Sequence, residues 1–135
     1  PTPDQIKGAA RGAQRFIDPA IYDRIIPGLV VQIRSSDGTI STELQVQSIG
    51  DIDYIGVPCE WFVEFGLQLK ERLHPRRALV VGSANDIVGY VPTAPAFERG
   101  GYETTFLTSS KLAPPAGQLL LDTAISLAAP NARRA

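Results

Sequence analysis

Residues 49–102 read IGDIDYIGVPCEWFVEFGLQLKERLHPRRALVVGSANDIVGYVPTAPAFERGGY, and this segment decides the fold. It holds one apolar run from Asp53 to Val57 and another from Ala78 to Val81. Short apolar runs between turn residues are typical of buried strands, whereas apolar side chains three or four positions apart indicate one face of a helix. Such a stripe lies between the two runs, and its members are Phe62, Phe65, Leu69 and Leu73. The segment therefore predicts a strand, a helix and a second strand.

The predicted strands bring polar residues to one place. If the strands are parallel, the crossover between them is right-handed and their carboxyl ends lie at the same edge of the sheet. Glu60 follows the first strand, and the small, polar loop of residues 82–85 follows the second. Tyr90 and Tyr102 come next, on an irregular segment rich in Gly and Pro. Because open α/β sheets bind ligands at this edge and irregular segments often carry function, we expect a site there.

Each candidate residue also has a structural interpretation. We expect Glu60 at the amino end of the helix, where the helix dipole favours a carboxylate that either binds a metal or only stabilises the first turn. Cys59 is either a nucleophile near that helix end or a small buried side chain. Tyr90 and Tyr102 are either site residues or packing residues. His74, the only histidine, stands beside a proline and is expected to cap the helix at the surface.

The residues before this segment predict helices and then strands. A helix is expected from Thr2 through Ile17, and a shorter one begins at Asp18-Pro19 and ends at Pro27-Gly28. The apolar, β-branched run from Leu29 to Ile33 indicates a strand, and an alternating strand is expected from Thr39 to Ile49 after a turn.

After residue 102 the sequence predicts a Pro-rich connection from Leu112 to Gly117 and a last helix that covers the sheet. Its expected apolar face consists of Ala116, Leu119, Leu120, Ala124, Leu127 and Ala128. The predicted fold is α/β, with a mixed β-sheet, a βαβ core and flanking helices. It divides into a helical lead-in over residues 1–28, the sheet and helices over 29–129, and a frayed tail over 130–135.

Composition limits the classes of function. The chain has 135 residues, of which 44% are hydrophobic and 20% charged, as in ordinary globular domains. A net charge of −1 with scattered basic residues argues against nucleic acid as a partner. Cys59 is the only cysteine, so no internal disulfide forms. Without a run of about 20 apolar residues or a secretory apolar core, we expect no transmembrane segment and a soluble protein, with the cytoplasm favoured but the compartment open.

Two stretches resemble one known family. They are LQVQSIGDIDYIGVPCEWFVEFGLQLKERL, residues 44–73, and ALVVGSANDIVGYVPTAPAFERGGYE, residues 78–103. Over about residues 42–127 the chain resembles the later part of the catalytic domain of the neutral/alkaline ceramidase family. Glu60 matches the zinc-binding glutamate of that family's VPGE-type turn, with Cys59 in place of the usual glycine. Tyr90 matches the zinc-binding tyrosine of its GYxxT-type loop. Tyr102, twelve residues later, matches the tyrosine of its YE pair, which faces the scissile amide.

The resemblance implies a zinc-dependent amide hydrolase acting on an N-acyl or other amide substrate through a metal-activated water. It implies that Glu60 and Tyr90 bind one zinc ion and that Tyr102 is catalytic. The family's two zinc-binding histidines, its serine and its arginine lie upstream of the matching region, and this chain has one histidine. The isolated chain is therefore expected to bind zinc poorly and to be inactive.

Three explanations fit a chain that holds half of a site. It is a subunit or cleaved portion of a hetero-oligomeric hydrolase whose second polypeptide carries the zinc-binding histidines, a fragment of a longer enzyme, or a derelict domain. We favour the first two, with a partner surface at an exposed sheet edge or an apolar patch. The alternative is a non-catalytic binding or assembly module that uses Trp61 and the two tyrosines as an interface.

Overall fold

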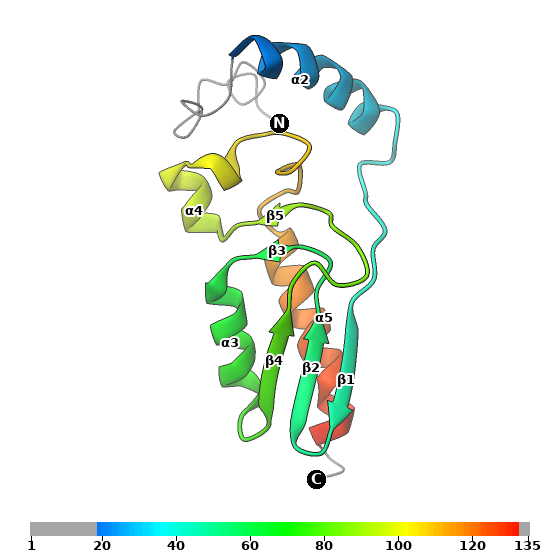
Figure 1. Cartoon of the computed structure of the whole chain (residues 1–135), viewed down its shortest axis with the longest axis vertical. Coiled ribbons are helices and arrows are strands. Elements are labelled where there is room, and N and C mark those ends of the chain that lie inside the picture. Colours follow the sequence, from blue (N-terminus) through cyan, green and yellow to red (C-terminus); the bar gives the residue numbers. More distant parts are fainter. Residues whose placement is uncertain (1–18, 133–135) are drawn as a thin grey trace.

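The computed structural model describes residues 19–132 and has the predicted α/β architecture (Figure 1). The expected helix from Thr2 through Ile17 lies outside the described residues. No helix within residues 19–132 is long and apolar enough to span a membrane. The elements are α2 (Pro19–Arg34), β1 (Gln45–Ile49), β2 (Ile52–Gly56), β3 (Glu60–Trp61), α3 (Val63–Leu73), β4 (Arg77–Val81), β5 (Tyr90–Val91), α4 (Ala94–Arg99), η2 (Tyr102–Thr104) and α5 (Ala116–Ala132).

The predicted βαβ unit is confirmed. Strand β2 pairs in parallel with β4, from Ile52 opposite Arg77 to Gly56 opposite Val81, and α3 connects the two strands. Strand β1 pairs antiparallel with β2 through a tight turn at Gly50, whose φ of 60° is one that glycine adopts without strain. The result is a mixed three-stranded sheet in the order β1-β2-β4.

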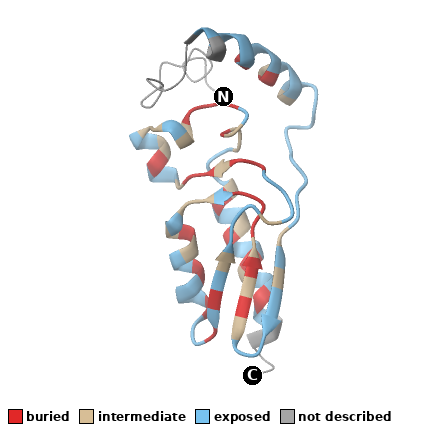
Figure 2. Cartoon of the chain, viewed as in Figure 1, coloured by how far each residue is buried: buried red, intermediate tan, exposed pale blue. Residues whose placement is uncertain are grey.

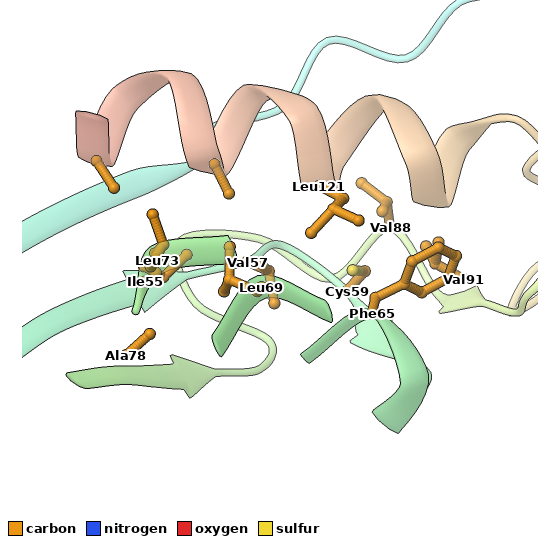
Figure 3. Packing of buried hydrophobic residues seen from close by; sticks show 12 residues of the cluster. Ile55, Val57, Cys59, Phe65, Leu69, Leu73, Ala78, Val88, Val91 and Leu121 are labelled. Carbon is orange, nitrogen blue, oxygen red and sulfur yellow. The ribbon is translucent and has the colours of Figure 1, made fainter. Parts of the chain in front are cut away.

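Helices cover one face of this sheet. Helix α3 packs against β4 and α5, and α5 also packs against β1 (Figure 1). Ile55 and Ala78 of the strands and Val57, directly after β2, belong to a core that α3 and α5 complete with Phe65, Leu69, Leu73, Leu121, Ala124 and Ala128 (Figures 2 and 3). The helical stripe predicted for residues 62–73 is thus largely the buried face of α3, with Phe62 as its N-cap.

The opposite face of the sheet is not covered by any element within residues 19–132 (Figure 1). Cross-strand neighbours on this face follow from the register, and we call the apolar members, Ile49, Ile52, Tyr54, Leu79 and Val81, the open sheet face. Three of them remain 67%, 45% and 46% exposed, namely Ile49, Leu79 and Val81. Parallel strands are normally covered on both faces, so this face is unusual.

A buried ion pair fixes the end of the sheet at which β2 and β4 begin. Asp53 is fully buried, and its carboxylate accepts hydrogen bonds from Arg76 Nε at 2.7 Å and Nη2 at 2.6 Å. Ser48 donates a further bond to Asp53 at 2.5 Å. The Arg76 guanidinium holds the pKa of the Asp53 carboxyl below its usual value, against the opposing effect of burial. This network ties β1, β2 and the start of β4 together.

The strand predicted from Leu29 to Ile33 is wrong. Helix α2 continues through Pro27 to Arg34, so the shorter helix does not end at Pro27-Gly28. Ile26 and Leu29 are buried and Ile33 packs beside them, at spacings of three and four, against Phe106 and Leu107. This tertiary contact favours a helix in a β-branched run that also suits a strand.

Two other boundaries and the buried face of α5 differ from the prediction. The strand expected from Thr39 to Ile49 is paired only from Gln45 onward, because no strand within residues 19–132 lies opposite the residues before it. The predicted face of α5 is also partly wrong, since Leu119 and Leu127 are 69% and 46% exposed. The buried positions are Gly117, Leu121, Ala124 and Ala128. The helix runs past Pro130 to Ala132, beyond the expected start of the tail.

Candidate active site

Glu60 and Tyr90 lie directly opposite each other. Strands β3 and β5 form a short parallel pair in which these two residues are register partners. The Glu60 N–H donates to the Gly89 carbonyl at 3.0 Å, and the Phe62 N–H donates to the Val91 carbonyl at 3.3 Å. Register partners in a parallel ladder direct their side chains to the same side. The predicted meeting of Glu60 with the loop after the second strand is confirmed.

Glu60 does not belong to the first turn of α3. The N-cap of that helix is Phe62, and the acidic residue in its first turn is Glu64. The expected position at the amino end of the helix is therefore wrong by about half a turn, because residues 60 and 61 pair with β5 instead. The carboxylate is exposed, and its role in stabilising the helix loses its structural basis.

Tyr102 completes the group. Its ring meets that of Tyr90 edge to face, with ring centroids 5.4 Å apart and planes at 76°. Tyr102 is 37% exposed at the start of η2, whereas Tyr90 is half-buried. The structure thus brings together Glu60, Tyr90 and Tyr102, three residues spread over more than forty positions of the sequence. The arrangement offers a carboxylate and two phenols at one surface.

A turn over residues 107–111 holds Tyr90 and Tyr102 in place beside each other. The Ser109 carbonyl accepts the Tyr90 N–H at 2.7 Å, and the Ser110 hydroxyl donates to the Glu103 carbonyl beside Tyr102. Lys111 Nζ donates to the Val88 carbonyl at 3.0 Å and to the Thr108 carbonyl at 2.8 Å. No sequence pattern predicts these supports, because each of these hydrogen bonds has a main-chain group as its partner.

Gly89 permits the close approach of that turn. Its φ is 107°, and a Cβ placed on it would lie 2.4 Å from the Ser109 carbonyl oxygen. We expect Gly89→Ala to lower the free energy of unfolding by about 1–3 kcal/mol and to separate Tyr90 from Tyr102. Gly100→Ala is the matched control, since Gly100 also has a positive φ, 75°, but nothing within 4 Å of a new Cβ. Urea denaturation of both variants checks this, and equal destabilisation would contradict the close-packing explanation.

The environment keeps Tyr90 protonated. Burial raises the pKa of its phenol to about 12, and the hydrogen bonding and negative charge of Glu60 add to the effect, followed by Tyr102. A phenolate at this position therefore needs a strong positive charge close by, such as a bound divalent cation. The same cation would be attracted by the Glu60 carboxylate. The electrostatics thus suit a pair of oxygen ligands in which the Tyr90 phenol loses its proton only when a cation is bound.

The other candidates have structural roles. Cys59 is fully buried in the core, and burial, followed by the charge of Glu60, raises the pKa of its thiol to about 12. Its side chain therefore stays protonated and is a poor nucleophile. His74 is the exposed C-cap of α3, as expected. Trp61 stacks on Phe65, with ring centroids 5.2 Å apart, so it belongs to the packing around α3.

The oxygen atoms of Glu60 and Tyr90 fit part of the ligand set of a zinc ion. Carboxylate oxygen is a usual zinc ligand, and the facing phenol supplies a second oxygen. Within residues 19–132 no three side chains of His, Cys, Asp or Glu gather closely enough to hold a metal. A catalytic zinc typically has three protein ligands, so a zinc ion at Glu60 and Tyr90 would need further ligands from outside residues 19–132.

Comparison with known proteins adds no relative to these observations. A scan against protein-family models, a search of curated proteins and a search of solved structures each returned no match. The resemblance to the ceramidase family over residues 42–127 stays a prediction from the sequence.

Proposed function

We propose that this chain is part of a zinc-dependent amide hydrolase, either as a subunit or as a fragment of a longer enzyme. The substrate is an N-acyl or other amide. The observation that carries the proposal is the meeting of Glu60, Tyr90 and Tyr102, which the resemblance requires and which three separate segments have to create.

Each residue has a distinct role in this proposal. Glu60 and Tyr90 hold the zinc ion, which when bound lowers the pKa of a water molecule and polarises the amide carbonyl. The Tyr102 hydroxyl donates a hydrogen bond to the carbonyl oxygen as negative charge develops there. The greater exposure of Tyr102 suits contact with a substrate, whereas half-buried Tyr90 suits a ligand fixed by its surroundings.

The open sheet face supports the proposal that this chain is one part of a larger α/β structure. Ile49, Leu79 and Val81 are exposed next to parallel strands, an arrangement that a complete α/β domain normally covers with helices. We infer that the missing polypeptide covers this face and brings the histidines to Glu60 and Tyr90. The same face also favours the second candidate function, a non-catalytic assembly module, because an interface alone needs no chemistry at the tyrosines.

Native mass spectrometry of the protein isolated from its source tests whether this chain works only as part of a larger assembly or a longer polypeptide. We expect the 14.5 kDa chain in a larger assembly with a second polypeptide, or as part of a longer one, and we expect hydrolysis of N-acyl amides to follow that larger species. An isolated chain of this mass with full activity would refute the proposal.

A further inference from the structure

The backbone that leads into Tyr102 is not stiffened by its own residues. Gly100 and Gly101 precede it, with φ angles of 75° and 137° that glycine adopts more readily than any other residue. Tyr102 opens η2, a short helical turn of three residues whose main-chain hydrogen bonds are long. The N–H groups of Thr104 and Thr105 donate these bonds at 3.3 and 3.2 Å. The direction of the Tyr102 ring therefore depends on further contacts to this backbone.

Threonine hydroxyl groups supply such contacts at the Gly101 carbonyl. The Thr105 hydroxyl donates to this carbonyl at 2.8 Å, and Thr105 is only 4% exposed. The Thr104 hydroxyl donates to the same carbonyl at 3.1 Å from a half-buried position. The Gly101 carbonyl belongs to the planar peptide group that also contains the Tyr102 nitrogen. A donor fixed on this carbonyl therefore fixes the plane from which Tyr102 starts.

Thr105 is itself held by a packed core. The two residues after it are buried and pack against α2 in a second core cluster, whose members are Ile26, Leu29, Phe106 and Leu107. A β-branched side chain such as threonine also has few choices at χ1. Because Thr105 is buried, water cannot easily replace its hydrogen bond. Thr105 thus connects a fixed part of the fold to the glycine pair before Tyr102.

We propose that Thr105 is a positioning residue for Tyr102. Its hydroxyl, bound to the Gly101 carbonyl, sets the edge-to-face contact of the Tyr102 ring with the Tyr90 ring. Thr105 acts through the backbone and touches neither a metal nor a substrate.

Ser110 does not duplicate this role. Its hydroxyl donates to the Glu103 carbonyl, which lies after Tyr102 in the chain, whereas the Gly101 carbonyl lies before it. The backbone torsions of a residue are set by the peptide groups on both of its sides. Each hydroxyl therefore fixes a different side of Tyr102, and loss of either one should release the ring.

Thr105→Val tests the hydrogen bond with little change of shape, because a methyl group replaces the hydroxyl. In the full chain, nuclear Overhauser contacts between the rings of Tyr90 and Tyr102 should be lost in Thr105→Val and restored in Thr105→Ser, which keeps the hydroxyl. Thr123→Val is the matched control. It removes an exposed hydroxyl on α5 that donates to the Leu119 carbonyl at 2.7 Å, and it should keep the ring contact.

Thr104→Val is a second variant for the case in which Thr105→Val does not fold. It removes the longer, half-buried hydroxyl bond to the Gly101 carbonyl, and we expect the ring contact to weaken. An undiminished ring contact in folded Thr105→Val overturns the proposal, as does an undiminished contact in Thr104→Val where the first variant does not fold. Failure of Thr105→Ser to keep the contact also overturns it, because the hydroxyl is then not the cause.

Turnover in the complete assembly is a second readout, and this part alone rests on the proposed function. We expect Thr105→Val to lower kcat about 10- to 100-fold with zinc content unchanged. It should add little to the loss in Tyr102→Phe, because Thr105 acts through Tyr102. Additive losses in the double variant overturn the positioning role. Parental turnover with a lost ring contact supports the positioning role and contradicts the catalytic role of Tyr102 instead.

Discussion

Glu60→Gln is expected to remove zinc and amide hydrolysis together from the complete assembly. The variant keeps the size of the side chain and its place opposite Tyr90, but it replaces a carboxylate with a neutral amide. Loss of a partner that only orients a metal ligand costs about 10–100-fold in metal affinity, so loss of a ligand should exceed about 100-fold. Metal analysis and a hydrolysis assay on the same sample check the result.

Tyr102→Phe is the matched comparison. It keeps the ring that meets Tyr90 edge to face and removes only the hydroxyl. We expect zinc to remain bound while turnover falls about 100- to 1000-fold, as when one oxyanion donor is lost. Zinc loss in both variants would contradict the separate roles of the two residues. Parental zinc content and turnover in both would favour the assembly module.

Arg76→Met is expected to have the largest effect on stability. The substitution keeps most of the apolar stem but leaves the Asp53 carboxylate, which is fully buried, without its charged partner. Breaking a buried ion pair in this way should lower the unfolding midpoint by about 10 °C or more at neutral pH. Arg77→Met is the control, because the Arg77–Asp51 pair is exposed and should change the midpoint by about 2 °C or less.

The effect of Arg76→Met should depend on pH. In the parent, the pKa of Asp53 is lowered in the folded state, so the pair stabilises the fold above the unfolded pKa of about 3.9. That contribution is lost as the pH falls through the lower folded pKa. The parent and the variant should therefore differ most at neutral pH and converge in acid. Thermal unfolding across this range measures the difference, and a gap that widens in acid would contradict the assigned role of Asp53.

The sequence predicted the parts of the fold that local pattern controls. The runs at 53–57 and 78–81 and the stripe at 62–73 are each regular, and their order predicted a βαβ unit. The structure shows that its two strands are parallel. Residues 29–33 show the limit of this reasoning. That β-branched run suits a strand and a helix equally, and the choice depends on Phe106 and Leu107, more than seventy positions away.

For the candidate site, the sequence likewise predicted some features and not others. The positions of Glu60, Tyr90 and Tyr102 followed from strand order and from the resemblance, and the structure brings them together. The pairing of β3 with β5 was not predicted, because strands of two residues carry no periodic pattern. The supports from Ser109 and Lys111 were equally invisible. The Ser109 carbonyl accepts from a main-chain N–H and Lys111 donates to main-chain carbonyls, and these partners carry no sequence signal.

We propose that Glu60 and Tyr90 together hold a metal ion that other polypeptide segments help to bind. Zinc content with ultraviolet difference spectroscopy tests it most directly, because a zinc-bound Tyr90 must lose its proton at a pH far below its metal-free pKa of about 12. We predict one zinc and one tyrosinate per chain in the complete assembly, no tyrosinate in Tyr90→Phe, and little zinc on the isolated chain. An active assembly that contains neither zinc nor tyrosinate would contradict the account.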